Sequence, residues 1–328
     1  MYRVAYRHLL RCRHALAALL LAFNLTAQAQ TWPAKPVRII VAVPPGGTTD
    51  LTARLLAKKY SDALGQTFLV DNRPGASSMI GTELVIRSPA DGYTLFLSSA
   101  SLSVNATLFG AKYKFDPMRD LSPIIWTSSV PLVLTLHPSV PAKSVKELAA
   151  LSKRTRKGLN GGHNGAGTTS HIALEMFRQM TGAAIESIGY KGGGPTTIAM
   201  LSGEIDFTFS TLSTVKSHVE SGRLRGLAVT TKKPSRVFPS LPTMDSMYPG
   251  FESDNWFGLF ALAGISKEIV GRLHTLSAEA LRSPELRDVI AKDGGEIVAS
   301  SPEQLGAHLR SEIARYAKVI KAGNITPD

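Results

Sequence analysis

Two short glycine-containing segments carry residue types that could hold a small anion. The first reads Gly46-Gly47-Thr48-Thr49-Asp50, and the second reads Gly165-Ala166-Gly167-Thr168-Thr169-Ser170-His171. The residues after each segment have the spacing of an amphipathic helix. Glycine allows a close approach, threonine adds a short hydroxyl donor, and the start of a helix offers unpaired N–H groups. Two such segments facing each other would bind a molecule with a carboxylate at each end.

Asp50 is an unexpected residue beside an anion, and two roles stay open for it. Its carboxylate can accept backbone N–H groups at the start of the helix and so hold the loop in shape. It can instead contact an ammonium group, if the ligand carries one. Neither segment is a nucleotide motif, because Gly-x-x-x-x-Gly-Lys is absent and the glycines in 162–167 have the wrong spacing for a dinucleotide fingerprint.

The sequence contains no pattern of a metal site or a catalytic nucleophile. The histidines after residue 29 lack the His-Glu-x-x-His spacing, and no Gly-x-Ser-x-Gly elbow is present. Ser170 and His171 are neighbours on a predicted helix, so their side chains point apart. We therefore expect no catalytic residue, no metal ion and no cofactor. The alternative from another class is an exported enzyme that acts on a small organic acid.

Alternating strands and helices must position the two segments. The repeated β–α units predict an α/β protein with largely parallel sheets, whose ligands lie where strands lead into helices. The glycine-rich run 161–167 is predicted to be a loop. Strands are predicted at 37–43, 67–71, 94–98, 124–127, 133–136, 184–188, 205–209, 226–230 and 256–261. Helices are predicted at 50–64, 76–87, 103–108, 144–157, 169–181, 195–202, 213–221, 266–282, 284–292 and 302–322.

Residues 1–29 have the pattern of a secretory signal peptide. Four arginines precede a short apolar run, 15–25, which ends at Ala27-Gln28-Ala29. Removing this segment takes the formal charge from +12 to +8 and removes Cys12, the single cysteine. A disulfide is then excluded. The remaining cations are scattered, so we expect no nucleic-acid partner. The prediction is a periplasmic monomer that begins at Gln30.

Several strings resemble, in the same order along the chain, the substrate-binding receptors of tripartite tricarboxylate transporters, often called Bug proteins. They include PPGGTTDLTARLLA, VDNRPGASSMIGTELV, YKGGGP and WFGLFA. The resemblance implies an α/β, two-domain periplasmic binding protein-like fold with a ligand cleft between the domains and two hinge crossings. Domain 1 would comprise 30–108 and 226–328, and domain 2 would comprise 109–225. The implied ligand is a small carboxylate, and the implied partner is a permease of this transporter type or a sensor protein.

The resemblance and the two segments together predict a set of ligand-binding residues. They are Pro45, Gly46, Gly47, Thr48, Asp50, Ser98, Ser99, Ser101, His163, Asn164, Gly165, Gly167, Thr168, Thr169 and Ser210. By position, the resemblance also points to His171.

The chain departs from the family pattern at three places. Val43 stands where an aromatic residue is frequent, and His163-Asn164 stand where small residues are common. Ser210-Thr211 replace a frequent Asp-Asn pair. Losing an acid there favours ligands without an ammonium group, so Ser210→Asp is expected to improve amino-acid binding relative to dicarboxylate binding. Di- and tricarboxylates, aromatic acids, amino acids and nicotinate-like acids all stay open as ligands.

Overall fold

The computed structural model describes residues 32–326, and from Lys35 onward they form one compact unit. The predicted signal peptide, residues 1–29, lies outside the described residues. None of the helices within 32–326 has the length and apolar character that a membrane span requires.

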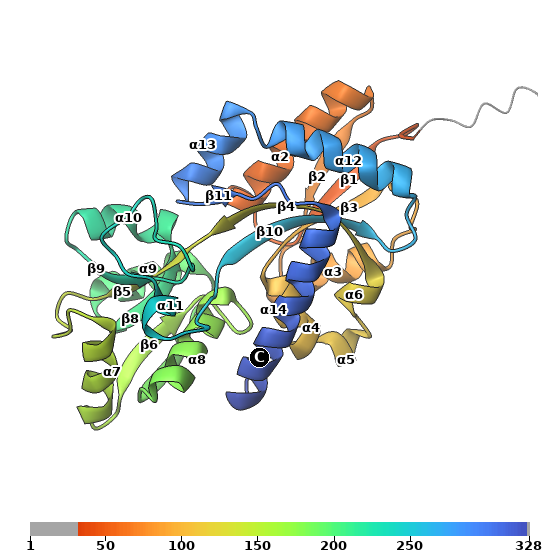
Figure 1. The fold of residues 1–328 in the computed structure, drawn as a ribbon. Helices are drawn as coiled ribbons and strands as arrows, with labels where there is room; N and C mark the ends of the chain where they lie inside the picture. Colours follow the sequence, from red (N-terminus) through yellow and green to blue (C-terminus); the bar gives the residue numbers. More distant parts are fainter. Residues whose placement is uncertain (1–31, 327–328) are drawn as a thin grey trace, which may run out of the picture. The chain divides into compact units, whose positions relative to one another are not determined.

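Two sheets organise the compact unit (Figure 1). In the first sheet the strands follow the order β11-β4-β10-β3-β1-β2, with β1 parallel to β2 and β3, and β10 antiparallel to β3 and β4. Its strands are β1 (Val37–Val41), β2 (Phe68–Asn72), β3 (Thr94–Ser99), β4 (Leu121–Val130), β10 (Asn255–Leu262) and β11 (Glu296–Ile297).

The second sheet has the order β7-β6-β8-β5-β9. Strand β6 is parallel to both neighbours, whereas β5 is antiparallel to β8 and β9. Its strands are β5 (Leu132–Leu136), β6 (Leu159–His163), β7 (Ile185–Gly189), β8 (Phe207–Thr211) and β9 (Arg225–Val229).

Helices pack against both sheets, and the predicted helices are present with small shifts at their ends. Ser301 and Gln304 form a capping box at the start of the last long helix. The longer helices are α2 (Thr48–Leu64), α3 (Met79–Ile86), α4 (Ser101–Leu108), α7 (Val145–Arg154), α8 (Thr169–Thr181), α9 (Gly193–Ser202), α10 (Leu212–Glu220), α12 (Lys267–Ala280), α13 (Pro284–Lys292) and α14 (Pro302–Ala322). Single turns occur at η2 (Ala76–Ser78), α5 (Gly110–Tyr113), α6 (Pro117–Asp120) and α11 (Met244–Met247).

Each sheet has its own apolar core. Phe96, Trp256 and Phe260 are buried in the first, and Phe177 and Phe209 are buried in the second. Helix α14 links the cores, because it packs on β4 and α4 while its last turns pack on α8. This shared helix makes residues 35–326 one compact unit despite their two sheets.

The chain passes between the sheets in two places, which we call the hinge segments. The first, residues 130–132, joins β4 to β5, and the second, 253–255, leads into β10. The two segments lie side by side, since Val130 pairs with Asn255 (Figure 1). Two adjacent extended segments are the kind of connection about which two lobes can rotate.

One predicted loop is a strand in its first half. Gly161 and Gly162 lie within β6 rather than in a turn. A Cβ at Gly161 would lie 2.7 Å from Leu174 and 2.9 Å from both Ile185 and Phe207. These glycines therefore allow close packing in the second sheet. In the sequence alone, glycines with this role cannot be distinguished from glycines of a loop.

Candidate functional site

A cavity of about 190 Å³ lies between the two sheets, beside the hinge segments. We call it the inter-sheet cavity. Its walls come from both halves of the compact unit, and they contain hydroxyl, amide and apolar groups without any Lys, Arg, Asp or Glu. The lining residues are Val43, Ser77, Ser78, Ser99, Ser101, Leu132, Asn164, Gly167, Thr168, Thr169, Thr211 and Asn255.

Four helices begin at this cavity. Ser78 is the N-cap of α3, Ser101 is the first residue of α4, Thr168 is the N-cap of α8 and Thr211 is the N-cap of α10. Each helix start carries backbone N–H groups without an intrahelical partner and the positive end of the helix dipole. The cavity is therefore electropositive although no cationic side chain lines it, which suits a small anion.

The turn before α3 has an unusual backbone. Ala76, Ser77 and Ser78 all have positive φ, at 45°, 52° and 74°. Left-handed backbone at a residue other than glycine costs on the order of 1–3 kcal/mol and is retained where neighbouring contacts enforce it. The Asn105 amide donates to the Ser77 carbonyl at 2.5 Å, and the Ser77 hydroxyl donates to the Ala166 carbonyl at 3.2 Å. The second bond joins a turn of the first half to the glycine segment of the second.

The first glycine segment is held in shape by Asp50, which is buried. Its Oδ2 accepts the Gly46 N–H and the Arg54 Nε–H, both at 3.0 Å, and its Oδ1 accepts the Asn72 amide at 3.0 Å. Burial alone would raise the pKa of Asp50, but the hydrogen bonds from Arg54, Gly46 and Asn72 outweigh burial and lower it. These donors all belong to the protein. This arrangement matches the loop-holding role, which is one of the two roles that the sequence left open for Asp50.

The second glycine segment is held in shape by a pair of histidines. The rings of His163 and His171 stack with centroids 4.0 Å apart. Gly165 donates its N–H to His163 Nδ1 at 3.2 Å, and Gly167 donates to His171 Nδ1 at 3.3 Å. Both rings must then be unprotonated at Nδ1. Burial, followed by repulsion from His163 and Arg178, lowers the pKa of His171 to about 4.

In both glycine segments, the side chain at the third position of the following helix accepts a backbone N–H of the segment. Asp50 is the third residue of α2 and holds the N–H of Gly46, four residues earlier. His171 is the third residue of α8 and holds the N–H of Gly167, also four residues earlier. The similarity of the two strings thus reflects a shared local geometry.

The inter-sheet cavity brings together part of the predicted set. Six predicted residues line it, namely Ser99, Ser101, Asn164, Gly167, Thr168 and Thr169. The others lie outside its lining, namely Pro45, Gly46, Gly47, Thr48, Asp50, Ser98, His163, Gly165 and Ser210. Ser98, His163 and Ser210 are buried next to lining residues. The first segment reaches the cavity only indirectly, because the Asn72 amide that contacts Asp50 also donates to the carbonyl of Val43 at 3.2 Å.

The sequence interpretation missed several lining residues. Ser77 and Ser78 lie in the string VDNRPGASSMIGTELV, where a run of small polar residues between a Pro-Gly step and a helix is the pattern that could have pointed to them. Asn255, at the start of β10, carries no local pattern of this kind.

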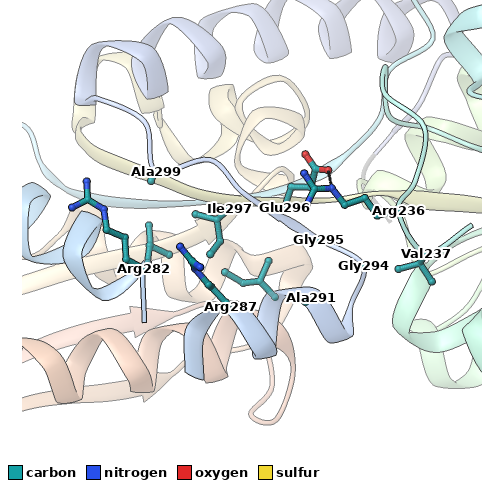
Figure 2. Close-up of a pocket in the computed structure, with 12 residues that line it drawn as sticks. Arg236, Val237, Arg282, Arg287, Ala291, Gly294, Gly295, Glu296, Ile297 and Ala299 are labelled. Carbon is teal, nitrogen blue, oxygen red and sulfur yellow. Dashed lines mark ion pairs between the residues drawn. The ribbon is translucent and has the colours of Figure 1, made fainter. Parts of the chain in front are cut away.

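A larger cavity, of about 520 Å³, lies beside β11 and contains none of the predicted residues. Figure 2 shows the guanidinium groups of Arg282 and Arg287 on one side and the ion pair between Arg236 and Glu296 on the other. The ion pair spans 3.2 Å, but Arg236 is 87% exposed, so solvent screens it. No helix start and no glycine segment reaches this cavity. Within residues 32–326 no group of three His, Cys, Asp or Glu side chains is placed to hold a metal ion.

Comparisons with known proteins agree on one family. Residues 52–325 match the model of the tripartite tricarboxylate transporter family receptor. Protein BugT of Bordetella pertussis is 38% identical over 296 residues, which are 89% of this chain and 90% of BugT. Among solved structures, R. palustris Rpa4515 with adipate is 35% identical, with a TM-score of 0.79 over 90% of this chain and 100% of that protein.

The periplasmic binding protein BugD is 30% identical, with a TM-score of 0.76 over 90% of this chain and 99% of BugD. These likenesses confirm the predicted fold class, an α/β periplasmic binding protein-like fold with two sheets. The family match spans most of the chain; it contains the whole second glycine segment and begins at Thr52, just after the first. This chain belongs to the tripartite tricarboxylate transporter receptor family, whose members are periplasmic solute-binding proteins.

Proposed function

We propose that the inter-sheet cavity binds a small organic anion through its carboxylate groups, and that the chain delivers this anion for uptake. The observation that carries the proposal is the meeting of four helix starts in a cavity without charged side chains. Carboxylate oxygens would accept the free N–H groups of these helix starts and the hydroxyls of Ser101, Thr168 and Thr211. The bound adipate of the R. palustris relative supports a dicarboxylate as the first class to test.

Such contacts can supply enough binding free energy for micromolar affinity. A hydrogen bond to a charged group contributes about 1.5–3 kcal/mol, and micromolar binding needs about 8 kcal/mol. The cavity volume of about 190 Å³ favours short ligands over bulky aromatic acids. No acid among residues 32–326 lines the cavity, so an ammonium group has no acidic partner there. Ser210, which stands where an acid is frequent in the family, is buried beside the lining.

The division into domains is part of this proposal. The pairing of β4 with β10 supports assigning residues 109–130 to domain 1, in place of the predicted boundary at 108. Met244 and Phe251 pack in the core of the second sheet, which supports extending domain 2 from 225 to 253. Domain 1 would then comprise 30–130 and 254–328, and domain 2 would comprise 131–253. The ligand cavity would lie between these two domains.

The proposed setting is the periplasm, reached through a cleaved signal peptide. The family supports a membrane permease of the tripartite tricarboxylate type as the partner. A receptor that reports to a sensor protein is the alternative, and it would use the same cavity. We propose a binding protein rather than an enzyme, because the cavity lining contains no acid, histidine, lysine or cysteine that could transfer a proton or form a covalent bond.

The test is a thermal-shift screen of dicarboxylates of increasing length, followed by calorimetry on two matched variants. Thr168→Val removes an N-cap hydroxyl that lines the cavity, and Thr243→Val removes the N-cap hydroxyl of α11 outside it. We expect the first change to weaken dicarboxylate binding roughly tenfold or more and the second to leave it unchanged. Equal losses in both variants, or no shift with any carboxylate, would contradict the proposal. Consumption of the bound acid during incubation would identify an enzyme instead.

A further inference from the structure

The hinge segments separate two cavities. Successive residues of an extended strand point to opposite faces. Leu132 and Asn255 line the inter-sheet cavity, whereas their neighbours Pro131 and Asp254 line a second cavity of about 450 Å³. Glu252, two residues before Asp254, lines the second cavity as well. The two cavities therefore lie on opposite faces of the same two hinge segments, and we call the second one the back cavity.

The back cavity is also built from both halves of the compact unit. From the side of the first sheet it receives Trp126 and Ser129 of β4 together with residues 296–298 around β11. From the side of the second sheet it receives residues 231–236, which follow β9. A molecule in this cavity would thus touch both halves and the hinge at once.

Asp254 has an unsatisfied carboxylate oxygen in this cavity. Its Oδ2 accepts the hydroxyl of Ser129 at 3.0 Å. Its Oδ1 is buried and has no hydrogen-bond donor among residues 32–326. Burial, followed by repulsion from Glu252, raises the pKa of Asp254 to about 7. A buried carboxylate oxygen without a donor is costly, and a ligand that brings a donor removes this cost.

The other charged groups around the back cavity largely satisfy one another. Glu252 accepts from Lys232 at 2.9 Å and from Arg315 of α14 at 2.6 Å, and Arg315 also pairs with Glu312. Arg236 pairs with Glu296 at 3.2 Å (Figure 2). Lys233 is exposed at the rim. Glu312 Oε2 and Arg315 Nε are also buried without a partner among the described residues, but neither residue lines the back cavity. Among the described acids that line it, Asp254 is the one with a buried oxygen that lacks a donor, so this part of the cavity favours a donor with a positive charge.

Apolar groups also line the back cavity. They are the indole of Trp126, Pro131, Pro234, Ile297 and Val298. Such a wall contributes binding energy to a hydrophobic body of a ligand and to the face of a cation.

We infer that the back cavity is a second ligand site, which binds a small primary ammonium ion carried on an apolar body. The Asp254 side chain turns to present its carboxylate to the ammonium group, and the apolar body lies against Trp126 and Val298. The site is distinct from the carboxylate cavity, and its occupation does not depend on the function proposed for that cavity.

Binding at the two cavities is coupled through the hinge, and this second step rests on the proposed function. Rotation that closes the inter-sheet cavity separates the walls of the back cavity, because the two lie on opposite faces of the hinge segments. An ammonium ligand that holds the back walls together opposes closure. The amine therefore weakens carboxylate binding, and by thermodynamic linkage the carboxylate weakens amine binding by the same factor.

The experiment uses 2-phenylethylammonium chloride, titrated calorimetrically into the full mature protein in phosphate buffer without any carboxylate. The neutral analogue 2-phenylethanol tests whether the positive charge is needed. We expect saturable binding of the amine with one site per chain, and binding of the alcohol that is weaker by roughly tenfold or more. Absence of saturable amine binding, or equal binding of the alcohol, overturns the inference and leaves the cavity to water.

Two variants locate the site, and one variant serves as the control. Asp254→Asn removes the acid, and Val298→Trp fills the cavity while it leaves Asp254 in place. Asp288→Asn makes the same chemical change as the first variant at an exposed position of α13 that does not line the back cavity. Both cavity variants should lose amine binding by roughly tenfold or more, and the control should keep it. Retention of binding in folded Val298→Trp places the amine elsewhere and overturns the inference.

The coupling is measured last, with adipate titrated in the presence and absence of saturating amine. A weaker apparent affinity for adipate supports the coupling. An unchanged affinity overturns the coupling but not the amine site. Absence of any adipate binding refutes adipate as the ligand of the inter-sheet cavity instead, so the amine site and the carboxylate ligand are tested separately.

Discussion

Substituting Asp50 by asparagine tests whether this acid holds the first glycine segment in shape or contacts the ligand. The change keeps the size of the side chain but replaces one oxygen with an amide nitrogen. The remaining oxygen can still accept from Gly46 and Arg54, as Oδ2 does in the native protein. The new nitrogen then faces the amide nitrogen of Asn72, so one hydrogen bond becomes a contact between two donors.

Asn72 cannot remove this conflict by rotating its amide. Its oxygen accepts from Arg54 at 3.1 Å, and its nitrogen also donates to the carbonyl of Val43 at 3.2 Å. A rotated amide would lose both bonds. The variant thus loses one hydrogen bond to a charged group and weakens two others. Because Gly46 and Arg54 are solvent-exposed and can be hydrated, the expected loss in the free energy of unfolding is about 1–2 kcal/mol.

The pH dependence has a defined sign. The folded protein holds the pKa of Asp50 below its ordinary value of 3.8, so the unfolded chain binds a proton at a higher pH than the folded protein does. The stabilisation is present above about pH 4 and is lost as the pH falls through the lowered pKa. The difference between native protein and Asp50→Asn should therefore be largest near neutral pH and shrink toward pH 3.

Urea unfolding at neutral and acidic pH measures the stability difference, and calorimetry with a dicarboxylate measures the affinity of each protein. Asp62→Asn is a matched control, since Asp62 lies on the same helix and forms an exposed ion pair with Lys58. Asp50 does not line the inter-sheet cavity, so we expect its substitution to change carboxylate affinity by less than about threefold. Full stability combined with a large change in affinity would refute the loop-holding role and favour direct contact with the ligand.

Three further changes probe the hinge, the second sheet and the second glycine segment. The folded protein raises the pKa of Asp254 from 3.8 to about 7, so its free energy of unfolding should fall by about 4 kcal/mol as the pH rises from about 4 to 7. Asp254→Asn should remove this fall, and urea unfolding at several pH values measures it. Gly161→Ala should lower the free energy of unfolding by about 1–3 kcal/mol, because the new methyl would crowd Leu174, Ile185 and Phe207. His171→Asp should weaken carboxylate binding roughly tenfold by adding a negative charge behind the second segment. His171→Asn is the neutral control, and equal affinities in these two variants would show that charge is not the cause.

The sequence predicts the order of strands and helices well because apolar spacing controls it. The antiparallel pairings of β10 and β5 depart from the largely parallel sheets that the β–α repeats predict. The other exceptions have local causes. Strand β6 begins with Leu-Asn-Gly-Gly, and its close packing depends on side chains from Leu174, Ile205 and Phe207 in other elements. No pattern within the strand itself records those contacts. Strand β11 is only two residues long, and it forms because β4 offers a free edge.

Three predicted residues that do not line the inter-sheet cavity, Ser98, His163 and Ser210, share a physical cause, which is strand alternation. Ser98 is buried and Ser99 lines the cavity, His163 is buried and Asn164 lines it, and Ser210 is buried next to the lining residue Thr211. In each case the lining residue is one position nearer the carboxyl end of the strand. Because neighbouring residues of a strand point to opposite faces, an error of one position moves a side chain from the cavity into the core.

The turn at 76–78 was beyond sequence reasoning for a different reason. Alanine and serine have no preference for left-handed backbone, so three such residues in a row are not expected from their types. The contacts of Ser77 with Asn105 and Ala166, which lie 28 and 89 residues away, accompany this conformation. A site that tertiary contacts create in this way is recognised only after the halves are assembled.

The difference between Asp50 and His171 follows from the charge that each position can tolerate. Both side chains occupy the third position of a helix and hold a glycine N–H four residues earlier. At the first segment, which does not line the inter-sheet cavity, a carboxylate gains from the helix start and from Arg54 without opposing an anion. At the second segment, Gly167 and Thr168 line the cavity, and a carboxylate at the third position would repel a bound carboxylate in a site that is poor in solvent. A neutral imidazole, kept unprotonated by burial and by stacking on His163, accepts the same backbone bond and leaves the dipole of α8 available to the ligand.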